Sequence, residues 1–194
     1  MNYFIEKEGN KKGRIIVVSA PSGAGKTTLC RHLLKKIPQI AYSISHTTRQ
    51  PRKNEIEGKD YYFISTKEFE EKINQNFWVE WAKVHTNYYG TSKKHLERQT
   101  HQGLNVLLEI DIKGAKQIKN LFPDAVTIFI MAPSLDVLEK RLRQRETDTD
   151  EIINMRLENA KAEIEQKDFY DYIIVNDGLD LACERICEIV KESL

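Results

Sequence analysis

The 194-residue sequence has few cysteines, no long apolar run and almost no net charge, and each shortage excludes a class of protein. Its three cysteines, Cys30, Cys183 and Cys187, form no disulfide or metal framework. Cys183 and Cys187 stand four residues apart in a helical pattern, which favours a buried apolar pair. No apolar run approaches the ~20 residues of a membrane-spanning helix, and the polar first residues lack a signal-peptide core. We therefore expect a cytoplasmic protein in a reducing compartment.

Charge of either sign is balanced, with 30 lysines and arginines against 29 aspartates and glutamates and a formal net charge of +1. Such a balance gives no general attraction to nucleic acid or to an anionic membrane, so we expect neither as a partner. Any anion site must be built from local basic side chains. The 40% hydrophobic content is enough for a core, and the length suits one core with small inserted lobes. The sequence leaves a homo-oligomer open.

The most informative motif is residues 20–27, APSGAGKT, between an apolar run at 15–18 and a helical pattern at 28–36. A strand, a glycine loop with lysine and hydroxyl, and a helix in this order form a cradle for nucleotide phosphates. Lys26 is predicted to reach the β- and γ-phosphates of a bound nucleotide, and the Thr27 hydroxyl to bind Mg²⁺. Ala20 replaces the usual glycine, which a negative φ would tolerate; the alternative to a cradle is a glycine-rich turn beside a surface lysine. The predicted phosphate-binding residues of this segment, which the family resemblance given below assigns to ATP, are Ala20, Pro21, Ser22, Gly23, Ala24, Gly25, Lys26, Thr27 and Thr28.

Hydrophobic periodicity divides the rest of the chain into strands and helices. We expect strands at 15–18, 40–45, 61–64, 77–84, 105–111, 125–131 and 172–175. We expect helices at 28–36, 93–102, 113–121 and 135–145, one capped by Thr66, one carrying Ile153, Leu157, Ala160 and Ile164 on one face, and one from Asp180. Residues 1–13 are predicted to be a frayed arm, 47–60 a loop and 87–90 a turn.

The order of these elements predicts an α/β fold. Strands and helices alternate at both ends of the chain, which favours a parallel-sheet core with helices on both faces. The nearly continuous apolar strands at 105–111 and 125–131 suit the centre of such a sheet. Residues 45–91 are richer in strands and loops, and we interpret them as a mixed α/β lobe inserted into a core of residues 1–44 and 92–194.

Two polar groups in the inserted lobe suit nucleotide recognition. Arg49 and Arg52 lie three residues apart in a proline-containing loop, where guanidinium forks could bind phosphate oxygens; solvated loop arginines are the alternative. Glu80 lies on an aromatic strand, where a carboxylate could accept hydrogen bonds from the N1–H and N2 amine of guanine. Adenine has a lone pair at N1, so the same carboxylate would receive no hydrogen bond there. Such a carboxylate would discriminate strongly between guanine and adenine. A plain surface carboxylate is the alternative.

Two further groups of residues lie in the predicted core. Asp111 ends an apolar strand, a place where an acid of a phosphate-loop fold holds Mg²⁺ directly or through water; a helix N-cap is the alternative. Arg141, Arg145 and Arg156 surround an acidic stretch at 146–151. They suit a mobile lid that brings cations onto a transferring phosphoryl group, and a salt-bridged surface hairpin would give the same pattern.

Taken together, these motifs resemble those of the guanylate kinases, a branch of the nucleoside monophosphate kinases. The resemblance runs from about residue 14 to residue 191, almost the whole chain, and several ordered motifs carry it. These motifs are residues 19–27, 45–52, 58–63, 80–82, 87–91, 108–114, 141–156 and 174–177.

The resemblance implies a phosphate-loop core, a GMP-binding lobe and a helical lid at about 137–160, and transfer of the γ-phosphoryl of ATP to GMP, and to dGMP, with Mg²⁺ in purine nucleotide metabolism. It implies a metal site at Thr27 and Asp111 and an adenine-side loop at Asn176 and Asp177. The implied GMP-binding residues are Ser45, Arg49, Arg52, Tyr61, Glu80, Tyr89, Thr91 and Glu109. The implied catalytic residues are Lys26, Arg49, Arg141, Arg145 and Arg156.

Two rival functions are compatible with parts of this pattern. A guanylate-kinase-like binding module keeps the fold for peptide recognition, but such modules often degrade the phosphate loop, which is intact here. A kinase with another phosphate acceptor would keep the loop, but Glu80 and the tyrosines of the lobe argue against it. Release of ADP with GMP, dGMP, AMP or UMP as acceptor would distinguish the three.

Overall fold

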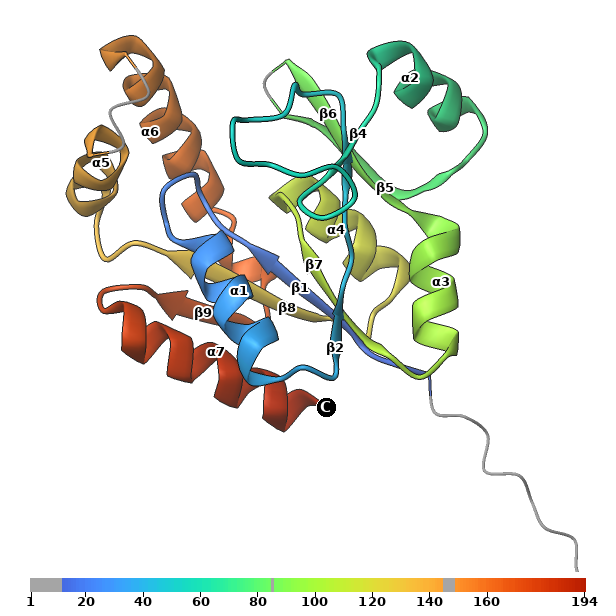
Figure 1. Cartoon of the computed structure of the whole chain (residues 1–194). Helices are drawn as coiled ribbons and strands as arrows, with labels where there is room; N and C mark the ends of the chain where they lie inside the picture. The colour runs from blue at the N-terminus through green and yellow to red at the C-terminus, as the bar shows by residue number, and fades with distance from the viewer. Residues whose placement is uncertain (1–11, 85, 145–148) are drawn as a thin grey trace, which may run out of the picture.

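The computed structural model of the chain describes residues 12–84, 86–144 and 149–194. Its core is a five-stranded parallel sheet in the order β2-β7-β1-β8-β9 (Figure 1). These strands are β1 (Ile15–Ser19), β2 (Ile40–Tyr42), β7 (Asn105–Glu109), β8 (Val126–Met131) and β9 (Tyr172–Val175). The predicted α/β fold with a parallel core is therefore confirmed.

Helices cover both faces of this sheet, because the central strand β1 is apolar on each side. Ile16 and Val18 pack into one buried cluster, with residues of α1 (Lys26–Lys36), α5 (Leu135–Arg143), α6 (Asp150–Ile164) and α7 (Leu179–Ser193). Ile15 and Val17 pack into a second cluster, with residues of α3 (Lys93–His101), α4 (Ile112–Leu121) and the region after the short 3-10 helix η1 (Lys167–Phe169). Alternate residues of one strand thus build two separate cores.

A second, four-stranded sheet in the order β4-β3-β6-β5 lies above the parallel sheet in Figure 1. Its strands are β3 (His46–Thr47), β4 (Tyr62–Phe63), β5 (Trp78–Val84) and β6 (Asn87–Ser92), with α2 (Thr66–Asn74) packed on it. Phe69 of α2 is fully buried and stacks on Trp78 and Tyr88, with ring centroids 4.3 and 5.1 Å apart. This aromatic cluster gives the 45–91 segment a small core of its own.

Two predictions within this segment were wrong, and strand β3 was not predicted. The predicted loop at 47–60 is confirmed except for Thr47, which belongs to β3, whereas the predicted turn at 87–90 belongs to β6. Gly90 suggested the turn, but a Cβ there would lie 2.9 Å from the Phe69 ring and 3.1 Å from the Trp78 ring, so glycine is needed for close packing. Ser65, and not Thr66, caps α2 by accepting a hydrogen bond from the backbone N–H of Glu68 at 3.1 Å.

Elsewhere the predicted elements are confirmed with small shifts of their ends. Helix α1 begins at Lys26, two residues before the predicted start, because the phosphate loop runs directly into it from Gly25. Cys183 and Cys187 are buried on one face of α7, as predicted, and Cys30 is buried as well; none of the three is in a disulfide. Of the predicted frayed arm at 1–13, residues 1–11 lie outside the described residues, and its last residue is not frayed, because the Gly13 N–H donates to the Thr100 carbonyl at 2.8 Å. Among the described helices, none combines the length and apolarity needed to cross a membrane.

Candidate functional site

The phosphate loop connects β1 to α1 and has the backbone that its glycines predict. Gly23 and Gly25 have φ of 94° and 100°, a left-handed conformation that favours glycine. Asn76 is the only non-glycine residue with positive φ among the described residues, so Ala20 fits the first position of the loop without strain. A Cβ on Gly25 would lie 2.4 Å from the side-chain nitrogen of Asn176, which makes glycine necessary there for packing as well.

Asn176, which follows β9, packs against the phosphate loop and binds its backbone. Its side chain is buried, and its amide donates a hydrogen bond to the Ala24 carbonyl at 2.8 Å. Its backbone carbonyl accepts a hydrogen bond from Nη2 of Arg141 at 2.8 Å, while Nη1 of Arg141 is buried without a hydrogen-bond partner among the described residues. The neighbouring Asp177 is exposed. The segment after β9 therefore joins the phosphate loop to an arginine of α5.

The first residues of α1 face the carboxyl end of β7. Lys26 donates a hydrogen bond to the Ile110 carbonyl at 3.4 Å, and the Thr27 hydroxyl donates to the Glu109 carboxylate at 2.6 Å. Asp111 is the N-cap of α4 and accepts a hydrogen bond from the Gly114 N–H at 2.7 Å. Asp111 therefore caps a helix, which was one of its two predicted roles, and it also lines both cavities described next.

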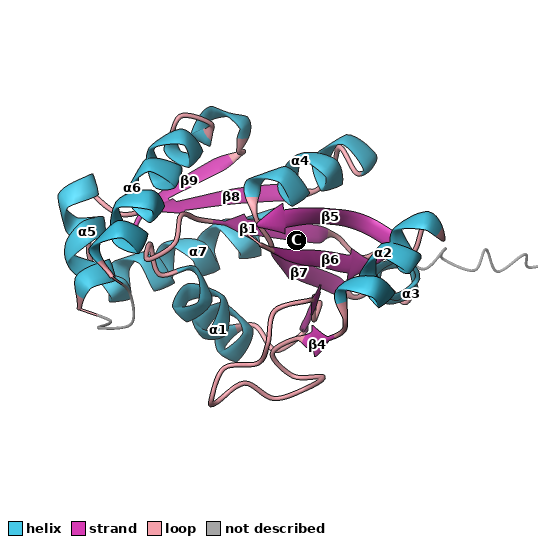
Figure 2. Cartoon of the chain, turned by 90° about the horizontal axis from the view of Figure 1, so that it is seen from above, coloured by secondary structure: helices cyan, strands magenta, loops and turns pink. Residues whose placement is uncertain are grey.

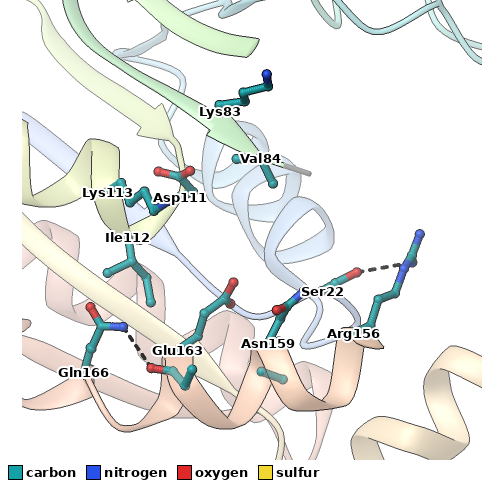
Figure 3. Close-up of a pocket in the computed structure, with 12 residues that line it drawn as sticks. Ser22, Lys83, Val84, Asp111, Ile112, Lys113, Arg156, Asn159, Glu163 and Gln166 are labelled. Carbon is teal, nitrogen blue, oxygen red and sulfur yellow. Dashed lines mark hydrogen bonds between the residues drawn. The ribbon is translucent and has the colours of Figure 1, made fainter. Parts of the chain in front are cut away.

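One cavity, of about 330 Å³, lies between the phosphate loop and α6 (Figure 3). Ser22, Asp111 and Arg156 line it, and Nη1 of Arg156 donates to the Ser22 hydroxyl at 3.4 Å. Lys83, Lys113 and Glu163 also line it. Burial raises the pKa of Glu163 to about 7. The positive charge of Lys26 lowers this pKa, and the negative charge of Asp111 raises it further. Cations from β5, α4 and α6 therefore surround a space beside the loop.

A second cavity, of about 190 Å³, lies between the two sheets and shares Asp111 and Val84 with the first. Lys26 of the phosphate loop lines it from the core side. The predicted GMP-binding residues that line it are Ser45, Tyr61, Glu80, Tyr89 and Glu109. Most of the predicted GMP-binding residues therefore line a cavity that adjoins the cavity beside the phosphate loop.

Glu80 is the most buried acid of this cavity, with only 3% of its surface exposed. A β-bulge between Trp78 and Glu80 lets the Trp78 ring join the aromatic cluster while Glu80 faces the cavity. The Thr91 hydroxyl donates to the Glu80 carboxylate at 2.5 Å. Burial raises the pKa of Glu80 to about 7, opposed by the Thr91 hydrogen bond and assisted by the charge of Asp111. The Thr91 hydrogen bond orients the carboxylate and leaves it able to accept further hydrogen bonds, which a site that binds N–H groups requires.

Arg49 lies at the edge of the lobe with its guanidinium already held. Glu55 accepts two hydrogen bonds from it, at 2.8 and 2.9 Å, and Nε of Arg49 donates to the Tyr89 hydroxyl at 3.3 Å. The guanidinium carbon also lies 5.4 Å from the centre of the Tyr61 ring. The Arg52 backbone N–H donates to the same Glu55 carboxylate at 2.8 Å, and Arg52 lines a larger cavity of about 840 Å³ with Thr27, Tyr61 and Glu109.

Sequence reasoning missed three residues of this region. Glu55, three residues after Arg52, could have been found as an acid placed to pair with loop arginines. Glu163 recurs two helical turns, seven residues, after Arg156 and so faces the same cavity. Lys83 gave no signal, because a lysine on a strand is usually solvated. The predicted catalytic Arg145 lies outside the described residues.

Comparison with known proteins gives one consistent result. The family model described as guanylate kinase matches residues 12–193. The guanylate kinase of Carboxydothermus hydrogenoformans is 50% identical over 171 residues, which cover 88% of this chain and 84% of that protein. The guanylate kinase of Geobacter metallireducens is 46% identical over 180 residues, 93% of this chain and 89% of that protein. The crystal structure of guanylate kinase from Anaplasma phagocytophilum superposes with a TM-score of 0.78 at 36% identity, covering 94% of this chain and 86% of that one.

Proposed function

The chain belongs to the guanylate kinase family, the ATP:GMP phosphotransferases, and on this premise we propose which of its residues bind each nucleotide and move the phosphoryl group. The reaction converts ATP and GMP to ADP and GDP. The observation that carries the proposal is the pair of adjoining cavities that share Asp111, one beside the phosphate loop and one around Glu80. Two nucleotides in these cavities would face each other across the wall that Val84 and Asp111 share.

We assign the guanine site to Glu80, with Thr91 and Ser45 beside it. The Glu80 carboxylate accepts the N1–H and the N2 amine of guanine, while Thr91 keeps it oriented. Adenine offers a lone pair at N1, so it would leave this buried carboxylate without a donor, a mismatch that discriminates strongly. Glu109 lies at the far wall of the same cavity.

The phosphate of GMP is assigned to Arg49, Arg52, Tyr61 and Tyr89. Arg49 and the two tyrosines already contact one another, and guanidinium and phenol donors match the oxygens of a phosphate group. Arg52 lines the adjoining cavity, which has Tyr61 of this group in its wall. None of these residues is assigned to the ribose 2′-hydroxyl, so we propose that dGMP is accepted as well.

ATP is assigned to the loop of residues 20–28, with its phosphates on the backbone N–H groups and on Lys26. Arg141, Arg145 and Arg156 are proposed as the cations of a lid at about 137–160. Arg156 already contacts Ser22 of the loop, and the buried Nη1 of Arg141 has no hydrogen-bond partner within the described residues, which suits an anionic ligand. The Asn176–Asp177 segment is proposed to lie beside the adenine while Asn176 braces the loop.

Mg²⁺ is the cofactor we propose, and the oxygen groups at the loop fit it. Hydroxyl and carboxylate oxygens, here those of Thr27 and Asp111, are ligands that Mg²⁺ prefers, and in kinases the metal takes its other ligands from phosphates and water. Among the described residues no group of three or more acids, histidines or cysteines could hold a metal by itself. When bound with ATP, the ion would neutralise phosphate charge.

Catalysis in this arrangement is mainly a matter of position and charge. The GMP phosphate is already largely ionised near neutral pH, so no general base is needed. The difficulty is to bring two polyanions together, and Lys26 and the arginines offset that repulsion. Closure of the 45–91 lobe and the lid over the core would also exclude the water that could otherwise hydrolyse ATP. We propose the cytoplasm as the compartment, since all three cysteines are free.

The test is an ADP-release assay with GMP, dGMP, AMP and UMP as acceptors, with and without Mg²⁺. We expect turnover with GMP and dGMP only, and only with the metal. In Glu80→Gln the preference for GMP over AMP should collapse, because an amide presents a donor where guanine needs an acceptor. Glu71→Gln, at an exposed site on α2, is the matched control and should behave as wild type. Unchanged GMP preference in Glu80→Gln would remove Glu80 from base recognition.

A further inference from the structure

The carboxylate of Glu80 belongs to the inserted lobe, but it rests against a helix of the core. Figure 2 shows α4 alongside β5, and the first turn of α4 meets the strand at Glu80. We propose that Gly114 and Gln117, both on α4, are positioning residues that set the place and direction of the Glu80 carboxylate for guanine recognition. This inference rests on the proposed role of Glu80 in binding the base.

Gly114 positions the carboxylate by leaving room for it. A Cβ on Gly114 would lie 2.3 Å from Oε2 of Glu80 and 3.1 Å from its Cδ, whereas ordinary contact starts at 3.4 Å. Any side chain at this position therefore displaces Oε2 by about 1 Å, the difference between 3.4 and 2.3 Å. The helix cannot easily withdraw instead, because Gln117 ties α4 to Trp81 of β5 through two hydrogen bonds, at 2.8 and 3.2 Å.

Gln117 positions the strand that carries Glu80. Strand β5 is at the edge of its sheet, so the outer side of its backbone lacks a neighbouring strand. The Gln117 side chain takes that place at Trp81: its amide donates to the Trp81 carbonyl at 2.8 Å and its carbonyl accepts from the Trp81 N–H at 3.2 Å. The residue next to Glu80 is thus tied to α4 by two hydrogen bonds.

The two oxygens of Glu80 are therefore fixed from opposite sides. Thr91 of β6 holds Oε1 from within the lobe, and Gly114 of the core limits Oε2. A pair of adjacent N–H donors can be recognised only if the plane of the carboxylate is fixed, because the two hydrogen bonds must form at once. The helix that begins after Asp111 consequently orients the base-binding group of the lobe.

A purely structural role for Gly114 predicts a different outcome. Gly114 has ordinary helical backbone within α4, and alanine forms helices better than glycine. If the glycine served only the helix, Gly114→Ala would raise the melting temperature and leave GMP binding alone. If it makes room for Glu80, the change must act on GMP through that carboxylate.

The experiment measures kcat and KM for GMP and ATP, with melting temperatures, for Gly114→Ala in the wild-type and Glu80→Ala backgrounds. We expect a fall of about 100-fold in kcat/KM for GMP in Gly114→Ala, the usual cost of a 1 Å misplacement, with KM for ATP unchanged. In the Glu80→Ala background the same change should cost nothing further and should raise the melting temperature. Asn120→Ala, at an exposed position of α4, is the control for alanine on this helix.

Gln117→Met gives an independent reading if Gly114→Ala does not fold. It keeps the side-chain length, removes both hydrogen bonds to Trp81, and should raise KM for GMP by about tenfold. Wild-type GMP kinetics in a folded Gly114→Ala, or additive effects with Glu80→Ala, would overturn the inference, as would wild-type GMP kinetics in Gln117→Met. If Glu80→Ala itself kept full GMP selectivity, the proposed function of Glu80 would fall first.

Discussion

Acidification should weaken GMP binding by protonating Glu80 before the substrate arrives. Burial raises the pKa of this carboxyl to about 7 in the free protein, but guanine requires the ionised form as an acceptor. Between pH 8 and pH 6 the ionised fraction of a group with that pKa falls from about nine-tenths to about one-tenth. The dissociation constant for GMP should therefore rise about tenfold, and GMP binding at pH 7 should release about half a proton.

The phosphate of GMP also titrates near pH 6, so wild type alone cannot isolate Glu80. Titration calorimetry of GMP binding to wild type and to Glu80→Gln, in buffers of different ionisation enthalpy, separates the two because only Glu80 is missing from the variant. ATP binding is the internal control and should show neither effect. Parallel pH dependences of GMP affinity in the two proteins, or equal proton release, would refute the reasoning.

The same shift predicts how folding stability depends on pH. The pKa of Glu80 rises from an ordinary value of 4.5 to about 7 in the fold, so the native state holds more protons than the unfolded chain between these values. The contribution of Glu80 is fully present below pH 4.5 and is lost as pH rises through 7, by about 3 kcal/mol in order of magnitude. Urea denaturation should show a flatter profile in Glu80→Gln, and an identical slope would contradict the shift.

Three further changes test the donor site and the phosphate site. Lys26→Ala should lower kcat by about 1000-fold without changing the melting temperature, and near-normal turnover would exclude Lys26 from the transfer. Arg49→Lys should raise KM for GMP by about tenfold but leave KM for ATP alone, because lysine lacks the two-pronged geometry; an equal change in both values would contradict this. Asn176→Ala removes the hydrogen bond to the Ala24 carbonyl. It should lower the free energy of unfolding, measured by urea denaturation, by about 1–2 kcal/mol and raise KM for ATP. An unchanged free energy of unfolding would show that the loop does not depend on this hydrogen bond.

Local patterns were enough for the parallel core. Each core strand is a short apolar run, and each covering helix has apolar residues at helical spacing, so both signals come from neighbours in the sequence. Local patterns failed at β3, which has only two residues and gains its strand character from pairing with β4 and β6. The equally short β4 was predicted, because the aromatic and β-branched residues at 61–64 favour a strand. Gly90 was interpreted as a turn because the aromatic rings that require a glycine there come from α2 and β5.

The candidate site shows the same division. The loop at 20–27, Arg49 and Glu80 could be chosen from residue type and context, and the structure places Lys26 and Glu80 on one cavity. Lys83 and Gln117 are harder to choose, because the role of a lysine on a strand or of a glutamine on a helix is recognisable only once its neighbours in the fold are known.

The sequence by itself determined the chemistry that is available: a phosphate loop, arginines for anions and a carboxylate among aromatics, each recognisable because its residues are adjacent in the chain. The tertiary structure decided how these groups are held. It set Glu80 against a glycine of α4, braced the loop with Asn176 and paired Arg49 with Glu55. The contacts of Glu80 and Asn176 join residues far apart in sequence, and the strength of all three contacts depends on distances and burial that only the packed molecule defines.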